Sequence, residues 1–232
     1  MRQNNKGKKF WFKCLKGILK IFIKKPKIKY LGGKIQQNSI VLSNHVGSTV
    51  PIKLELFADF PFRYWGTYEM NSGLKSVYKY LKDIYFYKKK HKGKKLSKFL
   101  AFIVAPFANM FYKGLQLIST YPDARFKTTL KKSLQTIQNG YNLVIFPEDS
   151  SKGYFDKLKH FYSGFAVFGN YCLKNGIDLN VYVSYYVKQN NEYIVDKPVK
   201  YSKLKTAFKD KYQLAEELLN RANNLKNIEV DI

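Results

Sequence analysis

The 232-residue chain lacks several features that define common protein classes. Its two cysteines, Cys14 and Cys172, lie far apart and have neither metal-ligand nor redox spacing, so we expect no disulfide framework, no zinc site and a reducing, cytoplasmic setting. No glycine-rich phosphate loop, dinucleotide fingerprint or serine elbow is present, so nucleotide-binding and hydrolase classes lack their signals. The uncharged apolar run from Phe99 to Tyr112 is too short to span a bilayer, and lysines interrupt the amino-terminal apolar residues, so we expect neither a membrane span nor a secretory signal.

Acidic residues are scarce, with 16 Asp and Glu against 42 Lys and Arg, which gives a net charge of +26. Arginine is scarce too, because nearly all of the positive charge comes from lysine. Nucleic-acid readers rely on the planar fork of arginine, whereas lysine is a hydrated point charge that suits anionic lipid or phosphate groups. We therefore expect an anionic membrane surface as a partner and no nucleic acid, and we keep a nucleic-acid-binding basic protein as an alternative.

The amino-terminal stretch from Lys8 to Lys25 has the pattern of a basic amphipathic helix. Lysines recur at helical spacing on one face, and apolar residues recur on the opposite face: Lys9, Lys13, Lys16, Lys20 and Lys24 against Trp11, Leu15, Ile18 and Phe22. Such a helix can lie in the interface of an anionic membrane. We expect residues 1–30 to be a membrane-association segment on the cytoplasmic face and residues 31–232 to form one α/β domain; the alternative is a helix packed on its own domain with a solvated lysine face.

Strand-like and helix-like stretches alternate along the rest of the chain. Apolar runs predict strands at 39–42, 61–67, 114–120, 142–146, 181–187 and 192–200, and periodic stripes predict helices at 51–58, 74–85, 96–112, 126–138, 156–174 and 214–225. A basic turn, residues 88–95, separates two of the helices and is expected to be solvated or membrane-facing. This alternation predicts an α/β fold with a mostly parallel central sheet flanked by helices.

Two polar loops follow the most strand-like runs of the sequence. Asn44 and His45 follow the run of residues 39–42, and the loop from Pro147 to Gly153 follows the run of residues 142–146. Loops at the carboxyl ends of parallel strands meet at one edge of the sheet, where ligands bind. A histidine near the start of the following helix is kept neutral by the helix dipole, so His45 can remove a proton from a hydroxyl. A histidine satisfied by local hydrogen bonds is the alternative interpretation of this motif.

The order of these motifs resembles the glycerophospholipid acyltransferase family, whose best-known members acylate 1-acyl-glycerol-3-phosphate. Asn44 and His45 match the first block of the family, although Val50 stands where an Asp is usual. Gly114 to Ile118 match the second block, but Thr120 replaces its arginine and Arg125 lies a few residues beyond. The third block matches at Phe146, Pro147 and Glu148, followed by a divergent Asp149, Ser150 and Ser151. The similarity in order and spacing extends over about residues 40 to 186.

This resemblance implies acyl transfer from acyl-CoA or an acyl carrier protein to a hydroxyl of a lysophospholipid, without a resident cofactor or metal. His45 would be the general base. The substrate would be bound by residues at the family positions and by nearby charged or polar side chains: Asn44, Gly114, Thr120, Arg125, Phe146, Pro147, Glu148, Asp149, Ser150 and Lys152. The carboxylate missing at position 50 leaves three alternatives, namely replacement by Glu55 of the following helix, replacement by a backbone carbonyl, or a non-catalytic lipid-binding relative.

Overall fold

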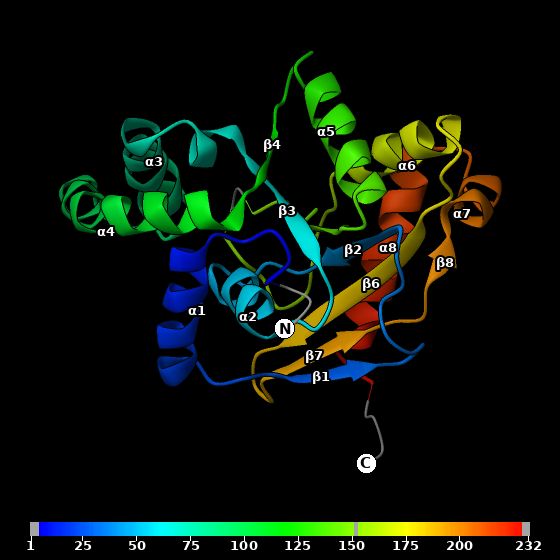
Figure 1. The fold of residues 1–232 in the computed structure, drawn as a ribbon, viewed down its shortest axis with the longest axis horizontal. Helices are drawn as coiled ribbons and strands as arrows, with labels where there is room; N and C mark the ends of the chain where they lie inside the picture. Colours follow the sequence, from blue (N-terminus) through cyan, green and yellow to red (C-terminus); the bar gives the residue numbers. More distant parts are fainter. Residues whose placement is uncertain (1–4, 151–152, 229–232) are drawn as a thin grey trace.

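The computed structural model describes residues 5–150 and 153–228. Its elements in chain order are α1 (Phe10–Phe22), β1 (Lys27–Tyr30), β2 (Ser39–Ser43), α2 (Thr49–Phe57), β3 (Phe62–Thr67), the 3-10 helix η2 (Tyr68–Asn71), α3 (Leu74–Tyr80), the π-helix η3 (Leu81–Lys89), α4 (Lys94–Leu115), β4 (Ile118–Thr120), α5 (Phe126–Gln138), β5 (Asn142–Ile145), α6 (Gly164–Lys174), β6 (Asn180–Val187), β7 (Glu192–Val195), β8 (Val199–Lys200), α7 (Tyr201–Ala207) and α8 (Lys211–Leu225). Figure 1 shows their arrangement.

Within the described residues, eight strands form one sheet in the order β1-β7-β6-β2-β5-β3-β4, with β8 paired to β6. The pairs β6–β2, β2–β5, β5–β3 and β3–β4 are parallel. In contrast, β6 pairs with β7 and with β8 in antiparallel fashion. All five residues of the central strand β2 are buried, as expected for a parallel strand that is covered on both faces. The predicted α/β class with a mostly parallel sheet flanked by helices is confirmed.

Alternate residues of the central strands belong to two different cores, one on each face of the sheet. Ile40 and Leu42 pack with α5, α6 and α8. Val41 and Val144 pack instead with Phe12 of α1 and with α2. Figure 1 shows the same layering, with α1 and α2 on one side of the sheet and α8 behind β6. The period-two pattern of the strands thus fixes the loops at their carboxyl ends between two helical layers.

A third hydrophobic cluster joins α3, η3 and α4 into a helical unit next to β4. Val77, Leu81 and Ala101 are fully or almost fully buried in it. This unit carries the basic turn of residues 88–95, which was expected to be solvated or to face a membrane, and positions that turn relative to the sheet.

Several predicted elements have different bounds in the structure, and the helix predicted over residues 74–85 is divided into α3 and η3. The strand predicted over residues 114–120 is reduced to β4, because Gly114 and Leu115 end α4. The helix predicted over residues 156–174 begins only at Gly164. The strand predicted over residues 192–200 is divided into β7 and β8, and α7 follows without having been predicted.

The amino-terminal stretch is closely tied to the sheet. At the end of the predicted segment 1–30, residues 27–30 form β1, which pairs with β7. Phe12 of α1 is fully buried. Lys16 was expected on a cationic face but is only 1% exposed, so that prediction is wrong for this lysine. Its ammonium group lies 2.9 Å from Oε1 of Glu55, and this buried pair explains why a charged residue is tolerated there.

None of the helices in the described parts of the chain is both long and apolar enough to cross a membrane.

Candidate active site

The two predicted loops meet because their strands are neighbours in register. Leu42 of β2 pairs with Ile145 of β5, and His45 and Glu148 each lie three residues further along the chain. The backbone N–H of His45 donates a hydrogen bond of 3.1 Å to Oε2 of Glu148. The carboxylate of one loop therefore holds the backbone of the other.

Asn44 fixes the first loop to the opposite neighbour of β2. Its Nδ2 donates to the carbonyl oxygen of Tyr186 (3.1 Å), and the Tyr186 N–H donates to its Oδ1 (2.7 Å). The side chain thereby extends the ladder between β2 and β6 by one step. In the structure the Asn44 amide positions the loop, and its predicted contact with substrate stays a prediction.

The turn after His45 has an unusual backbone. Val46 and Gly47 have φ values of +38° and +64°, and a positive φ is costly for a β-branched residue such as valine. The turn leads into α2, where Ser48 occupies the N-cap position without a side-chain hydrogen bond and Pro51 lies in the first turn. The predicted helix start is thus correct within two residues, and the strained turn connects His45 to that helix.

The second loop is held by the segment that precedes α6. Pro147 accepts a hydrogen bond from Tyr162 N–H (2.8 Å), and the Asp149 N–H donates to the carbonyl of His160 (3.1 Å). Glu148 and Phe161 form an isolated antiparallel bridge between these segments. This second strand-like contact fixes Glu148 at the sheet edge.

Aromatic rings surround the His45 imidazole. Its centroid lies 4.7 Å from that of Phe146 and 5.3 Å from that of Tyr154, the latter in a stacked arrangement. Nδ1 is buried and makes no hydrogen bond within the described residues. The ring is therefore held by packing, without the carboxylate partner that the family motif would provide.

This environment favours the neutral imidazole. Burial is the main cause that lowers the pKa of His45 to about 4, and the charge of Lys89 lowers it further, while backbone groups of His45 and Gly47 partly offset both effects. Helix polarity was the predicted cause of neutrality, but burial and Lys89 are the causes that the structure identifies. A neutral ring is the form that accepts a proton.

The pKa values of two charged groups in the site, Glu148 and Lys89, are shifted in opposite directions. Burial raises the pKa of Glu148, although hydrogen bonds from the backbone of His45 and Phe155 and the charge of Lys89 oppose the rise. Burial lowers the pKa of Lys89, and the carboxylates of Asp149 and Glu148 oppose this. The site thus brings an imidazole, a carboxylate and an ammonium group into one partly desolvated region.

No protein-family model and no curated protein matches the sequence. Among solved structures, the chain is similar to the 1-acyl-sn-glycerophosphate (LPA) acyltransferase PlsC from Thermotoga maritima, at 14% identity and a TM-score of 0.51, over 100% of this chain and 86% of that one. The chain shares the fold of that acyltransferase.

Several predicted binding residues have contacts elsewhere in this fold. A Cβ on Gly114 would lie 2.0 Å from the ring of Phe12, so this glycine allows α1 to pack closely on α4. Thr120 Oγ1 donates to the carbonyl of Gly66 (3.1 Å) and links β4 to β3. Both residues thus contribute to the packing of the fold, and their predicted contact with substrate stays a prediction.

Arg125, the arginine nearest to the second family block, belongs to an exposed cluster. It forms an ion pair of 2.7 Å with Asp123 and lies over the rings of Tyr68 and Tyr121, at 5.2 and 4.6 Å. The pairing lowers the pKa of Asp123 to about 2. The guanidinium thus already has a carboxylate partner. Lys152, the other predicted cation, lies outside the described residues.

Glu55 was predicted to replace the missing carboxylate beside His45. In the structure it is buried and its two oxygens contact ammonium groups, Oε1 that of Lys16 at 2.9 Å and Oε2 that of Lys8 at 3.4 Å. Burial is the main cause that lowers the pKa of Lys8 to about 8. To serve His45, the Glu55 carboxylate would have to leave two buried cations, at a cost of several kcal/mol.

Three residues of this site were missed by sequence reasoning: Lys89, Lys90 and Tyr154. Lys89 Nζ lies 2.6 Å from Oγ of Ser150, and both ammonium groups lie within 6 Å of the Tyr154 ring centroid. The run of lysines in the basic turn is the sequence signal for these cations. Because η3 is a π-helix, a helical periodicity of 3.6 residues does not tell which of its lysines point inward.

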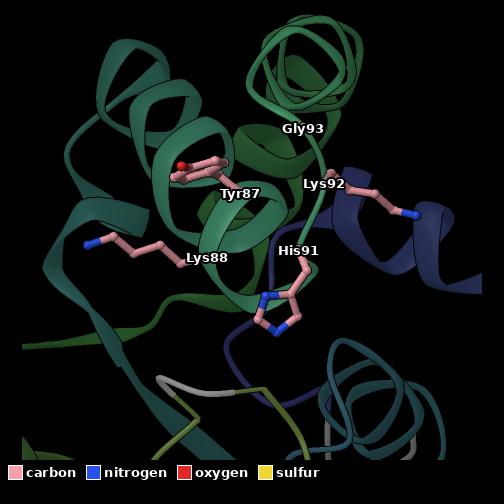
Figure 2. Close-up of a pocket in the computed structure, with 5 residues that line it drawn as sticks. All are labelled: Tyr87, Lys88, His91, Lys92 and Gly93. Atoms are coloured by element: carbon pink, nitrogen blue, oxygen red, sulfur yellow. The ribbon is translucent and has the colours of Figure 1, made fainter.

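The outer side of the basic turn contains a separate hollow of about 520 Å³, shown in Figure 2. It is lined by Tyr87, Lys88, His91, Lys92 and Gly93. Lys88 and Lys92 extend to opposite sides of the turn in this view. In the described parts of the chain, no group of three or more His, Cys, Asp or Glu side chains is arranged to hold a metal ion.

Proposed function

We propose that this protein transfers an acyl group from a thioester donor, acyl-CoA or an acyl carrier protein, to a hydroxyl group of a lysophospholipid such as 1-acyl-glycerol-3-phosphate. The observation that carries the proposal is the junction of the two loops, in which Glu148 holds the backbone of His45 at the carboxyl edge of a parallel sheet, and burial lowers the pKa of the His45 imidazole. The shared fold with an acyltransferase supports it.

The chemistry assigned to His45 is general base catalysis. Because Nδ1 is buried, Nε2 is the nitrogen that takes the proton from the acceptor hydroxyl as the hydroxyl oxygen attacks the thioester carbonyl. The carbon–sulfur bond then breaks, and the imidazolium returns the proton to the thiolate, so the products are an ester and a free thiol. Such a base contributes about 10²–10⁴-fold to the rate. Glu148 keeps the base in place through the His45 backbone.

His45→Ala tests the catalytic assignment, and His160→Ala is the matched control, because His160 is an exposed histidine next to the second loop. We expect His45→Ala to lower kcat by about 10²–10⁴-fold and His160→Ala to leave it within twofold. Products would be analysed by mass spectrometry with a panel of lysolipids and both donor types. Full transfer by His45→Ala would overturn the assignment, and saturable lysolipid binding by the wild type without any turnover would instead identify a non-catalytic lipid-binding relative.

We further propose that the protein binds peripherally to an anionic membrane on its cytoplasmic face through α1 and α4. The two helices are in contact, since the ring of Phe12 lies 5.5 Å from that of Phe111. Both leave large apolar side chains exposed, for example Phe22 at 79% and Phe102 at 74%. Exposed apolar side chains together with a large positive charge are the features of an interfacial membrane site. The lysophospholipid acceptor would be drawn from this surface.

Phe102→Glu tests the membrane proposal, with Tyr212→Glu on α8 as a control of equal charge change at another exposed aromatic residue. Burying one phenylalanine contributes about 1.5–3 kcal/mol, so we expect at least about tenfold weaker binding of Phe102→Glu to phosphatidylglycerol vesicles in a flotation assay. Tyr212→Glu should bind as the wild type does. Equal binding by the two variants would refute docking through α4. Deleting α1 is a poorer test, because Phe12 and Lys16 are buried.

A further inference from the structure

Two lysines of the basic turn reach the candidate active site. Lys89 Nζ donates a hydrogen bond of 2.6 Å to Oγ of Ser150, in the same loop as Glu148. Lys90 Nζ lies 3.6 Å from the point where a Cβ on Gly47 would be, and therefore beside the loop of His45. The turn thus places one cation against each of the two loops.

A single ring connects these cations to the base. The ammonium groups of Lys89 and Lys90 lie 5.7 and 5.6 Å from the centroid of Tyr154, and Tyr154 stacks on His45 at 5.3 Å. Burial lowers the pKa of Lys89, and nearby carboxylates raise it. The acidic groups that act on it are Glu148 and Asp149, and one Glu148 oxygen already accepts from the His45 backbone.

The placement of two cations beside a general base opposes the reaction unless an anion is present. Proton transfer makes His45 positive, and Lys89 already disfavours that charge. A bound phosphate would offset the lysine charges and favour the imidazolium. The arginines that resemblance to the acyltransferases would place near the site are absent here, since Thr120 and Ser151 occupy those parts of the sequence and Arg125 is paired with Asp123.

We propose that Lys89 and Lys90 bind a phosphate group of a substrate beside His45. The inference rests on the proposed acyl transfer for the identity of that substrate, whose phosphate belongs either to the lysophospholipid headgroup or to the coenzyme A part of the donor. Lysine holds phosphate as a point charge, without the bidentate geometry of arginine. The hydroxyl of Ser150, now bonded to Lys89, supplies a further group for a phosphate oxygen.

The test compares Lys89→Gln with Lys88→Gln, which removes the same charge from the adjacent exposed position of the turn. Calorimetric titration with 1-hexanoyl-glycerol-3-phosphate, with 1-hexanoyl-glycerol and with coenzyme A needs no turnover. We expect Lys89→Gln to weaken binding of at least one phosphate-bearing probe about tenfold or more, Lys88→Gln to change it less than twofold, and Lys89→Arg to restore most of it. Binding of the uncharged glycerol ester should not change.

Kinetics then identify the source of the phosphate. A higher KM for the acceptor assigns the site to the lipid headgroup, and a higher KM for acyl-CoA assigns it to the donor; either result supports the proposal. Equal behaviour of Lys89→Gln and Lys88→Gln towards all probes would overturn it. A wild-type protein that yields no product with any thioester would refute the acyl transfer, while the calorimetric comparison would still test the phosphate site.

Discussion

The titration of His45 is the sharpest consequence of the site geometry. Burial first, and Lys89 second, lower its pKa from an ordinary 6.5 to about 4. The chain contains three histidines, so their imidazole resonances can be followed separately by NMR and assigned with a His45→Gln variant. We expect His45 to remain neutral until the solution is distinctly acidic.

The sign of the effect on stability follows from proton binding. Below pH 6.5 the unfolded chain protonates His45 and the folded chain does not, so stability is lost as the pH falls from 6.5 towards 4, and nothing changes above 6.5. Each pH unit corresponds to 1.36 kcal/mol, so the full shift is worth about 3 kcal/mol. At about pH 5 the loss should be about 2 kcal/mol relative to pH 7.5.

Urea unfolding at the two pH values measures this loss. The net charge makes the whole protein sensitive to acid, so the relevant quantity is the difference between the wild type and His45→Gln, which cannot gain the proton. Lys89→Gln should raise the pKa of His45, whereas Lys88→Gln should leave it unchanged. A pKa of His45 near 6.5 in the wild type would refute the account of a desolvated imidazole beside Lys89.

Two further predictions concern how α1 is attached. Glu55→Gln leaves the ammonium groups of Lys8 and Lys16 buried without their carboxylate, and we expect a loss of about 3–5 kcal/mol in the free energy of urea unfolding. Gly114→Ala places a methyl group against the buried ring of Phe12 and should cost about 1–3 kcal/mol in the same measurement, because the core must shift.

Each of these substitutions has a matched control. Glu192→Gln removes a carboxylate that pairs with Lys29 at the more exposed sheet edge, where such a pair contributes about 0–1 kcal/mol. Gly17→Ala adds a methyl group on α1 with nothing within 4 Å, and should be neutral or stabilising. If Glu55→Gln cost no more than Glu192→Gln, the buried ion pairs would not be what holds α1.

The central sheet could be predicted because its strands are continuous apolar runs. Residues 39–42 and 142–145 are buried on both faces, and burial explains why most of them are apolar. The proximity of His45 and Glu148 followed from the general geometry of parallel sheets. Their exact pairing required the register of Leu42 with Ile145, which nothing local in the sequence specifies.

The segment from Gly153 to Ser163 illustrates why other parts could not be predicted. Leu158 and Phe161 are buried and have spacing that also suits a helix. Their conformation depends instead on Asn223, whose side chain accepts from the Leu158 N–H and donates to its carbonyl, at 2.8 and 3.0 Å. This partner lies 65 residues away in α8, beyond the reach of any pattern based on neighbouring residues.

Lys16 was misplaced for a similar reason. Amphipathic analysis assigns every lysine to the polar face, and only the carboxylate of Glu55, 39 residues further on, makes burial of this one acceptable. The same pair, together with Lys8, whose ammonium group also donates to the carbonyl of Leu115 at 2.7 Å, attaches α1 to α2 and to the end of α4. A membrane-binding helix fixed in this way would orient the site relative to the bilayer.

The absence of the family carboxylate at position 50 is consistent with the rest of the site. Val50 is buried in the apolar core beneath α2, where a carboxylate would itself be costly without a partner. With Nδ1 of His45 unpaired within the described residues and Lys89 nearby, the protein groups around His45 favour a neutral imidazole and offer little to stabilise an imidazolium. If a substrate phosphate neutralises Lys89 and Lys90, the substrate itself supplies the negative charge that an Asp at position 50 would otherwise carry. Where that phosphate is the acceptor headgroup, acyl transfer to an acceptor that lacks phosphate should be slow even at saturation, which a comparison of kcat for phosphorylated and neutral acceptors would measure.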